Sequence, residues 1–144
     1  MAKSSDHISL ANKNQIALST LIQDKSPHSE WIATIAFYKA IHVIEAACRQ
    51  LGMKHAHNHN TRLELLRVKN EFKPIYKHFR HLYVASCIAR YLHDNENKKS
   101  YSSFDDYLEP SIVAQELVQI RLKHIEYGLL QNLSEADKSG FTRA

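Results

Sequence analysis

The sequence predicts an all-α fold, a single up-and-down bundle of four to five helices. A chain of 144 residues has the size of one domain, and 44% hydrophobic residues can fill one core. Only three Gly and three Pro interrupt the chain, which favours long elements. Apolar residues recur at helical spacing, and no segment alternates as a strand would. We expect a disordered start (1–7), the bundle (8–133) and a flexible polar tail (134–144).

The first two predicted helices cover about 8–24 and 30–51. The first has one apolar face, on which Ile8 and Leu18 lie. Ser26 and Pro27 are suited to an N-cap and a first helical turn. The second helix is apolar over most of its circumference, so we place it at the centre of the bundle. Gly52 is expected to end it at the C′ position.

Three more helices are predicted in the second half. Thr61 to Glu64 reads as a capping box that opens a short helix reaching about residue 72. Pro74 ends that helix and begins a fourth, which runs to about residue 93. A polar loop follows over 94–103, and a last helix covers about 110–133. Short connections between these helices favour antiparallel neighbours.

The composition of the chain argues against membrane and secreted proteins and against a zinc site built on cysteines. No apolar run approaches the roughly 18 residues of a membrane span, and the first residues lack the apolar stretch of a signal peptide. We therefore expect a cytoplasmic protein with no membrane partner. Cys48 and Cys87 form no CxxC pair, so we expect two reduced, buried thiols. The formal charge of +4 permits a nucleic-acid partner without requiring one.

The central helix carries a polar stripe. Tyr38, His42, Glu45 and Arg49 are spaced four, three and four residues apart, so they share one face. Two interpretations stay open. The stripe is either a solvated or hydrogen-bonded set that orients helices, or a polar cleft in which Glu45 poises His42 as an acid or base.

The fourth helix presents a matching face. Tyr76, Tyr83, Ser86, Arg90 and His93 recur at helical spacing, with Tyr91 beside them. Tyrosine and arginine together suit stacking on bases and pairing with phosphates, but they equally suit a protein interface or a hydrogen-bonded core wall. We expect the inward faces of the second and fourth helices to meet and to bring His42 and Arg90 into one pocket.

Two further groups allow more than one interpretation. His55, His57 and His59 alternate in a loop, which suggests either a metal site or an exposed polar loop near Arg62 that could face phosphate. A basic cluster is either a solvated face or an RNA-facing patch. Its members are Lys69, Lys73, Lys77, His78, Arg80 and His81.

Two stretches within residues 31–93 resemble HEPN-like proteins. The first runs from Phe37 to Ala47 and continues through Gly52 and the histidine loop to Arg62; the second ends in the pair Arg90–Tyr91. The resemblance implies a helical bundle that forms a homodimer. Many members are metal-independent RNases of toxin–antitoxin, CRISPR and antiphage systems, and others are non-catalytic RNA-binding or interaction modules.

The nuclease members of that family carry an arginine followed, after four to six residues, by a histidine near the start of a late helix. This chain has only Arg49 with His55, at the end of the second predicted helix. We therefore expect a homodimeric module, more binding than catalytic, that binds RNA or a partner protein in a prokaryotic defence or toxin–antitoxin setting. The alternative is a metal-independent RNase with a non-standard His/Arg site.

The expected site follows from these patterns. The candidate catalytic residues are His42, His57 and Arg90. The candidate residues for binding RNA or another ligand are Tyr38, Glu45, Arg49, Arg62, Tyr83 and Tyr91. We expect no metal and no cofactor.

Overall fold

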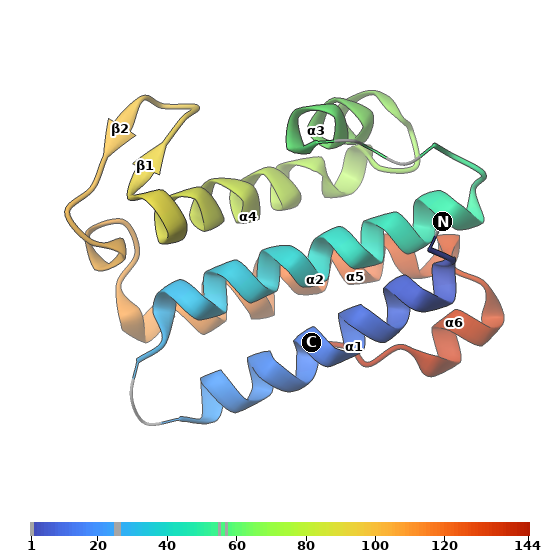
Figure 1. The fold of residues 1–144 in the computed structure, drawn as a ribbon, viewed down its shortest axis with the longest axis horizontal. Helices are drawn as coiled ribbons and strands as arrows, with labels where there is room; N and C mark the ends of the chain where they lie inside the picture. The colour runs from blue at the N-terminus through green and yellow to red at the C-terminus, as the bar shows by residue number, and fades with distance from the viewer. Residues whose placement is uncertain (1, 25–26, 55, 57) are drawn as a thin grey trace.

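A computed structural model describes residues 2–24, 27–54, 56 and 58–144, and it confirms the all-α bundle. The elements follow one another along the chain as Figure 1 shows. The long helices are α1 (Ser4–Gln23), α2 (Ser29–Gln50), α3 (His59–Val68) and α4 (Lys73–Tyr91). A final helical region contains η2 (Pro110–Ile112), η3 (Ala114–Leu122), α5 (Lys123–Leu129), η4 (Leu130–Asn132) and α6 (Glu135–Gly140).

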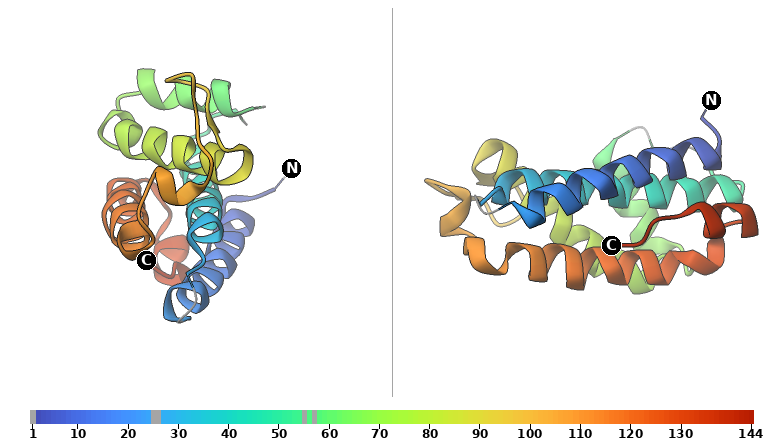
Figure 2. Two further views of the ribbon diagram at one scale, coloured as in Figure 1. Left: turned by 90° about the vertical axis from the view of Figure 1, so that its left-hand side faces the viewer. Right: turned by 90° about the horizontal axis from the view of Figure 1, so that it is seen from below.

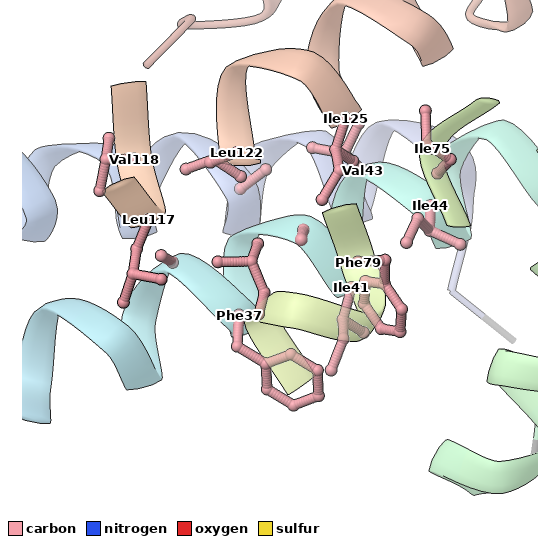
Figure 3. Packing of buried hydrophobic residues seen from close by; sticks show 14 of the residues in the cluster. Phe37, Ile41, Val43, Ile44, Ile75, Phe79, Leu117, Val118, Leu122 and Ile125 are labelled. Carbon is pink, nitrogen blue, oxygen red and sulfur yellow. The ribbon is translucent and has the colours of Figure 1, made fainter. Parts of the chain in front are cut away.

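Helix α2 lies at the centre of the bundle, as its composition predicts. It packs against α1 on one side, α4 on another and the η3–α5 region on a third (Figures 1 and 2). Figure 3 shows Ile41 and Ile44 of α2 toward Phe79 and Ile75 of α4, and Val43 of α2 beside Ile125 of α5. By length and hydropathy alone α2 could cross a membrane, but 72% of its apolar window is buried inside the bundle. Its apolar character is therefore explained by its position in the core.

The helix starts differ from the predicted ones by a few residues. Helix α2 begins after His28 as its N-cap, and the predicted cap Ser26 lies outside the described residues. Helix α3 begins at His59, because the side chain of Asn58 accepts a hydrogen bond from the Thr61 amide at 2.8 Å. Asn58 rather than Thr61 therefore caps this helix. Gly52, with φ of +71°, follows α2 in the left-handed conformation that was predicted for it.

The loop after α4 is more ordered than its polar composition indicates. Residues His93–Asp94 (β1) and Lys99–Ser100 (β2) pair as a small antiparallel hairpin. The 3-10 helix η1 (Phe104–Asp106) then inserts Phe104, which is fully buried, into the core. The predicted long helix 110–133 is also subdivided, because η3 is a π-helix of nine residues that continues directly into α5.

Both chain ends were predicted to be disordered or flexible, and the structure places both against the bundle. Helix α1 already begins at Ser4, where the Lys3 amide donates to Asp6 at 2.7 Å. At the other end, α6 is capped by Ser134, and its Asp137 accepts a hydrogen bond from Ser4. The last residues then run back between α1 and α5 (Figure 2, right). A predominantly polar composition does not reveal such contacts, because they depend on a few long-range hydrogen bonds.

Candidate functional site

Arg90 lies in the last turn of α4, surrounded by aromatic rings. Its Cζ atom is 5.8 Å from the centroid of Phe37, 6.0 Å from that of Tyr38 and 5.1 Å from that of Tyr91. The Nε and Nη2 atoms donate to the carbonyl and hydroxyl oxygens of Ser86, at 3.2 and 3.3 Å. These bonds hold the guanidinium on the bundle surface, where cation–π contact with the rings favours it.

His59 packs against the same group of aromatic rings. Its ring centroid is 5.2 Å from that of Phe37 and 5.7 Å from that of Tyr83. Arg62 Nη1 lies 3.1 Å from His59 Nδ1. A guanidinium can only donate, so Nδ1 accepts and a neutral His59 carries its proton on Nε2. Burial, together with the nearby charges of Arg62 and Arg90, lowers the pKa of His59, which favours this neutral form.

The polar stripe of α2 is partly a buried ion-pair network. Glu45, 1% exposed, accepts from Arg62 Nη2 at 3.1 Å through one oxygen and from Arg49 Nη2 at 3.2 Å through the other. Arg49 also donates to the Met53 carbonyl at 3.2 Å. Glu45 therefore fixes α3 and the loop before it against α2. This geometry gives Glu45, Arg49 and Arg62 a positioning role beneath the surface.

His42 lies on the same stripe of α2 but contacts α1. Its Nδ1 atom is 3.1 Å from His7 Nδ1, so one of the two atoms donates and the other accepts. Burial is the main cause that lowers the pKa of His42, and the nearby charge of Arg62 acts in the same direction, against Glu45. Within the described residues, no hydrogen bond, ion pair or ring contact joins His42 to Arg90. The histidine that contacts Phe37 together with Arg90 is His59.

The predicted site residues thus fall into separate groups. Tyr38, Tyr83 and Arg90 come together around Phe37, and Tyr91 joins them through its contact with Arg90. His42 instead contacts His7. His57 lies outside the described residues, as does His55. Among the residues that are described, no three His, Cys, Asp or Glu side chains gather closely enough to hold a metal ion.

Two participants were missed by the sequence analysis. His7 was assigned to a disordered start, and no periodicity in so short a segment could have linked it to His42. His59 was considered only as part of the histidine loop. The spacing of three residues between His59 and Arg62 at a helix start was the available signal, because such residues are neighbours on one face.

We define the aromatic–arginine surface as Tyr38, His59, Arg90 and Tyr91. Tyr38 is 39% and Tyr91 67% exposed, while Phe37 forms the buried floor beneath them. The surface offers a guanidinium, an imidazole N–H and two accessible rings, which are donors and π-faces without a carboxylate. Comparisons with known proteins return no match: no family model, no curated protein and no solved structure is similar to this chain.

Proposed function

We propose that this protein is a HEPN-like module that binds RNA through the aromatic–arginine surface without cleaving it. One observation carries the proposal: the Arg90 guanidinium lies within 6.0 Å of two exposed tyrosine rings and shares its contact with Phe37 with the half-buried His59. Single-stranded nucleic acid is bound by this combination of groups, because bases stack on rings and phosphates pair with cations.

Charge also supports an anionic partner. The chain has a formal charge of +4, and the aromatic–arginine surface itself contains no acidic residue. The carboxylate closest to it in the network, Glu45, is buried between two arginines. A phosphate at Arg90 would therefore meet an N–H of His59 and no unpaired negative charge.

Binding is favoured over cleavage by the proton on His59. Metal-free RNA cleavage needs a base whose lone pair can take the proton of the 2′-hydroxyl. In neutral His59 the lone pair is on Nδ1 and faces Arg62, so Nε2 presents a hydrogen-bond donor. His42 could supply a lone pair at Nε2 only if it donates through Nδ1 to His7, and its hydrogen bond is to α1 rather than to Arg90. Cleavage is therefore an outcome for the experiment to test.

The proposal includes the oligomeric state, the cellular location and the biological system. We expect a cytoplasmic homodimer, and sedimentation velocity of the full chain measures that state directly. A role in prokaryotic defence or toxin–antitoxin systems follows from the HEPN resemblance. A partner protein in place of RNA would be indicated by a failure of every RNA tested to bind.

The test measures the binding of fluorescently labelled single-stranded RNA by anisotropy, in EDTA and at several salt concentrations. Replacing Arg90 by Ala should weaken binding by about 10- to 100-fold, the effect of losing one charge-assisted hydrogen-bonding group. It should also lower the salt slope by about one. Tyr91→Leu should weaken binding by at least about fivefold, because the stacking face is lost.

Arg67→Ala is the matched control, since Arg67 is an exposed arginine that pairs with Glu64 on the outer side of α3. Its affinity should equal that of the wild type. Equal affinity of the Arg90 and Arg67 variants would refute the proposed surface. RNA cleavage by the wild type in EDTA, abolished in His42→Ala, would favour the nuclease alternative.

A further inference from the structure

A cavity of about 360 Å³ lies beside α4 on the side of the hairpin. It is formed by α4, the β1–β2 hairpin and the residues that flank η1 on both sides. Its volume lies in the range of small-molecule sites. Its principal polar side chains are Tyr76, Lys77, Arg80, His81, Tyr101 and Tyr107. None of them belongs to the aromatic–arginine surface.

The two carboxylates of the cavity already have partners within the wall. Asp94 Oδ1 accepts from the amides of Glu96 and Asn97, at 2.9 and 3.3 Å, and Oδ2 accepts from the Asn97 side chain at 2.7 Å. Glu96 accepts from Arg80 Nε at 2.7 Å. These bonds fix the β1–β2 turn against α4. They occupy both oxygens of Asp94 and the Oε2 atom of Glu96.

The donors, in contrast, are not used. Within the described residues, Lys77 Nζ and the hydroxyls of Tyr76, Tyr101 and Tyr107 have no hydrogen bond or ion pair with a side chain or backbone group. Burial, with the neighbouring Tyr101 and Asp94, raises the pKa of Tyr107 to about 12, so its hydroxyl keeps its proton. The cavity therefore presents one ammonium and three hydroxyl donors to its interior or rim.

The aromatic walls add a shape requirement. Tyr101 and Tyr107 meet edge to face, with centroids 5.6 Å apart and planes at 75°. Phe104 packs on Tyr107 from the core side at 5.7 Å. These contacts hold the two rings in fixed orientations, and a flat ring placed against them would gain stacking area without reordering the wall.

We propose that this cavity binds a small molecule in which a flat ring carries an anionic oxygen group, such as an aryl phosphate or an aryl carboxylate. Lys77 and the tyrosine hydroxyls would donate to the oxygens, while the ring would lie against Tyr101 and Tyr107. This inference does not depend on the proposed RNA binding, because it uses different residues of α4.

Titration calorimetry and NMR shift mapping with phenyl phosphate test the inference, with inorganic phosphate and phenol as its separate halves. We expect phenyl phosphate to bind at least about tenfold more tightly than either half. Benzoate distinguishes a preference for carboxylate from one for phosphate. Lys77→Gln should weaken binding of phenyl phosphate by about tenfold and Tyr107→Phe by a few-fold, since each removes one donor.

Lys123→Gln and Tyr127→Phe are matched controls, because both residues are exposed on α5 and neither lines this cavity. Lys77 is itself exposed, so its variant should fold like the wild type, which circular dichroism verifies. Absence of binding at millimolar phenyl phosphate, or equal binding by Lys77→Gln, would overturn the inference. Binding lost in Arg90→Ala but kept in Lys77→Gln would instead assign the ligand to the aromatic–arginine surface.

Discussion

Replacing Glu126 by Gln should destabilise the protein strongly, because it leaves a buried cation without its counter-charge. Lys39 on the central helix is fully buried, and its Nζ atom lies 2.8 Å from Glu126 Oε2. Gln15 Oε1 at 2.6 Å and the Thr142 carbonyl at 2.9 Å accept its hydrogen bonds. Burial lowers the pKa of Lys39, whereas the charge of Glu126 raises it. Glu126→Gln keeps the shape of the side chain and removes the charge.

The ionisation of Lys39 sets an upper limit on the free energy of unfolding that Glu126→Gln loses. Breaking a buried pair typically costs about 3–5 kcal/mol. The alternative for Lys39 is to lose its proton, which costs about 1.4 kcal/mol for each pH unit below its ordinary pKa of 10.5. That route sets a ceiling of about 5 kcal/mol at pH 7 and about 2 kcal/mol at pH 9. The lysine is charged in the unfolded chain and neutral in the folded variant, so the deficit shrinks as pH rises.

Urea unfolding followed by circular dichroism at pH 7 and pH 9 measures this deficit. Glu135→Gln is the matched control, since Glu135 is 92% exposed in its pair with Lys138 and its loss should change stability by no more than about 0.5 kcal/mol. A Lys39→Met, Glu126→Leu double variant should be close to the wild type, because neither charge remains buried. The reasoning fails if Glu126→Gln costs less than about 1 kcal/mol, or if its deficit is the same at both pH values.

Two other predictions concern packing between α4 and the last helices. His78, 8% exposed, stacks on His124 with centroids 4.6 Å apart, and burial with the charges of His124 and Arg121 lowers its pKa to about 4. The unfolded chain protonates His78 below about pH 6.5, whereas the folded protein does so only near pH 4. The free energy of unfolding should therefore fall by at most about 3 kcal/mol between pH 6.5 and 4. Urea unfolding at several pH values should show a smaller fall for His78→Gln than for the wild type, and an unchanged fall for His93→Gln. Gly128→Ala would place a Cβ atom 2.5 Å from Ile75 Cγ2. We expect the variant to lose about 1–3 kcal/mol of its free energy of unfolding and to show a lower thermal unfolding midpoint. Adding Ile75→Leu, which lacks that methyl group, should restore part of the loss.

The sequence predicts the helices of this fold better than their ends and connections. Helix α2 is predicted at almost its observed bounds because its apolar circumference and Gly52 are both local signals. The hairpin and the docked C-terminal segment depend instead on contacts between distant residues. Asn12 illustrates this, since it bonds the Gly140 carbonyl at 2.7 Å and the Thr142 amide at 2.8 Å. No helical or strand period marks such pairs.

Helical spacing predicts which aromatic and arginine side chains lie together on α2 and α4, but not which histidine lies beside them. Helical spacing correctly brings Tyr38 of α2 and Arg90 of α4 to one surface, because both long helices pack along their apolar faces. Spacing cannot tell which histidine joins them. Arg62 decides this, since its guanidinium bridges Glu45 and His59 and so places the start of α3 over Phe37.

Two interpretations of the polar stripe of α2 were left open, a hydrogen-bonded set that orients helices and a polar cleft. The contacts of Glu45 favour the first for this residue. A carboxylate that is 1% exposed and bonded to two arginines cannot meet a ligand, but it determines where His59 stands and which nitrogen of His59 faces outward. If Glu45 lost its charge, Arg62 would no longer be held between α2 and α3, and its constraint on His59 Nδ1 would be released. The donor character of the aromatic–arginine surface, on which RNA binding without cleavage is proposed, is thus set by a buried charge that RNA itself would not touch.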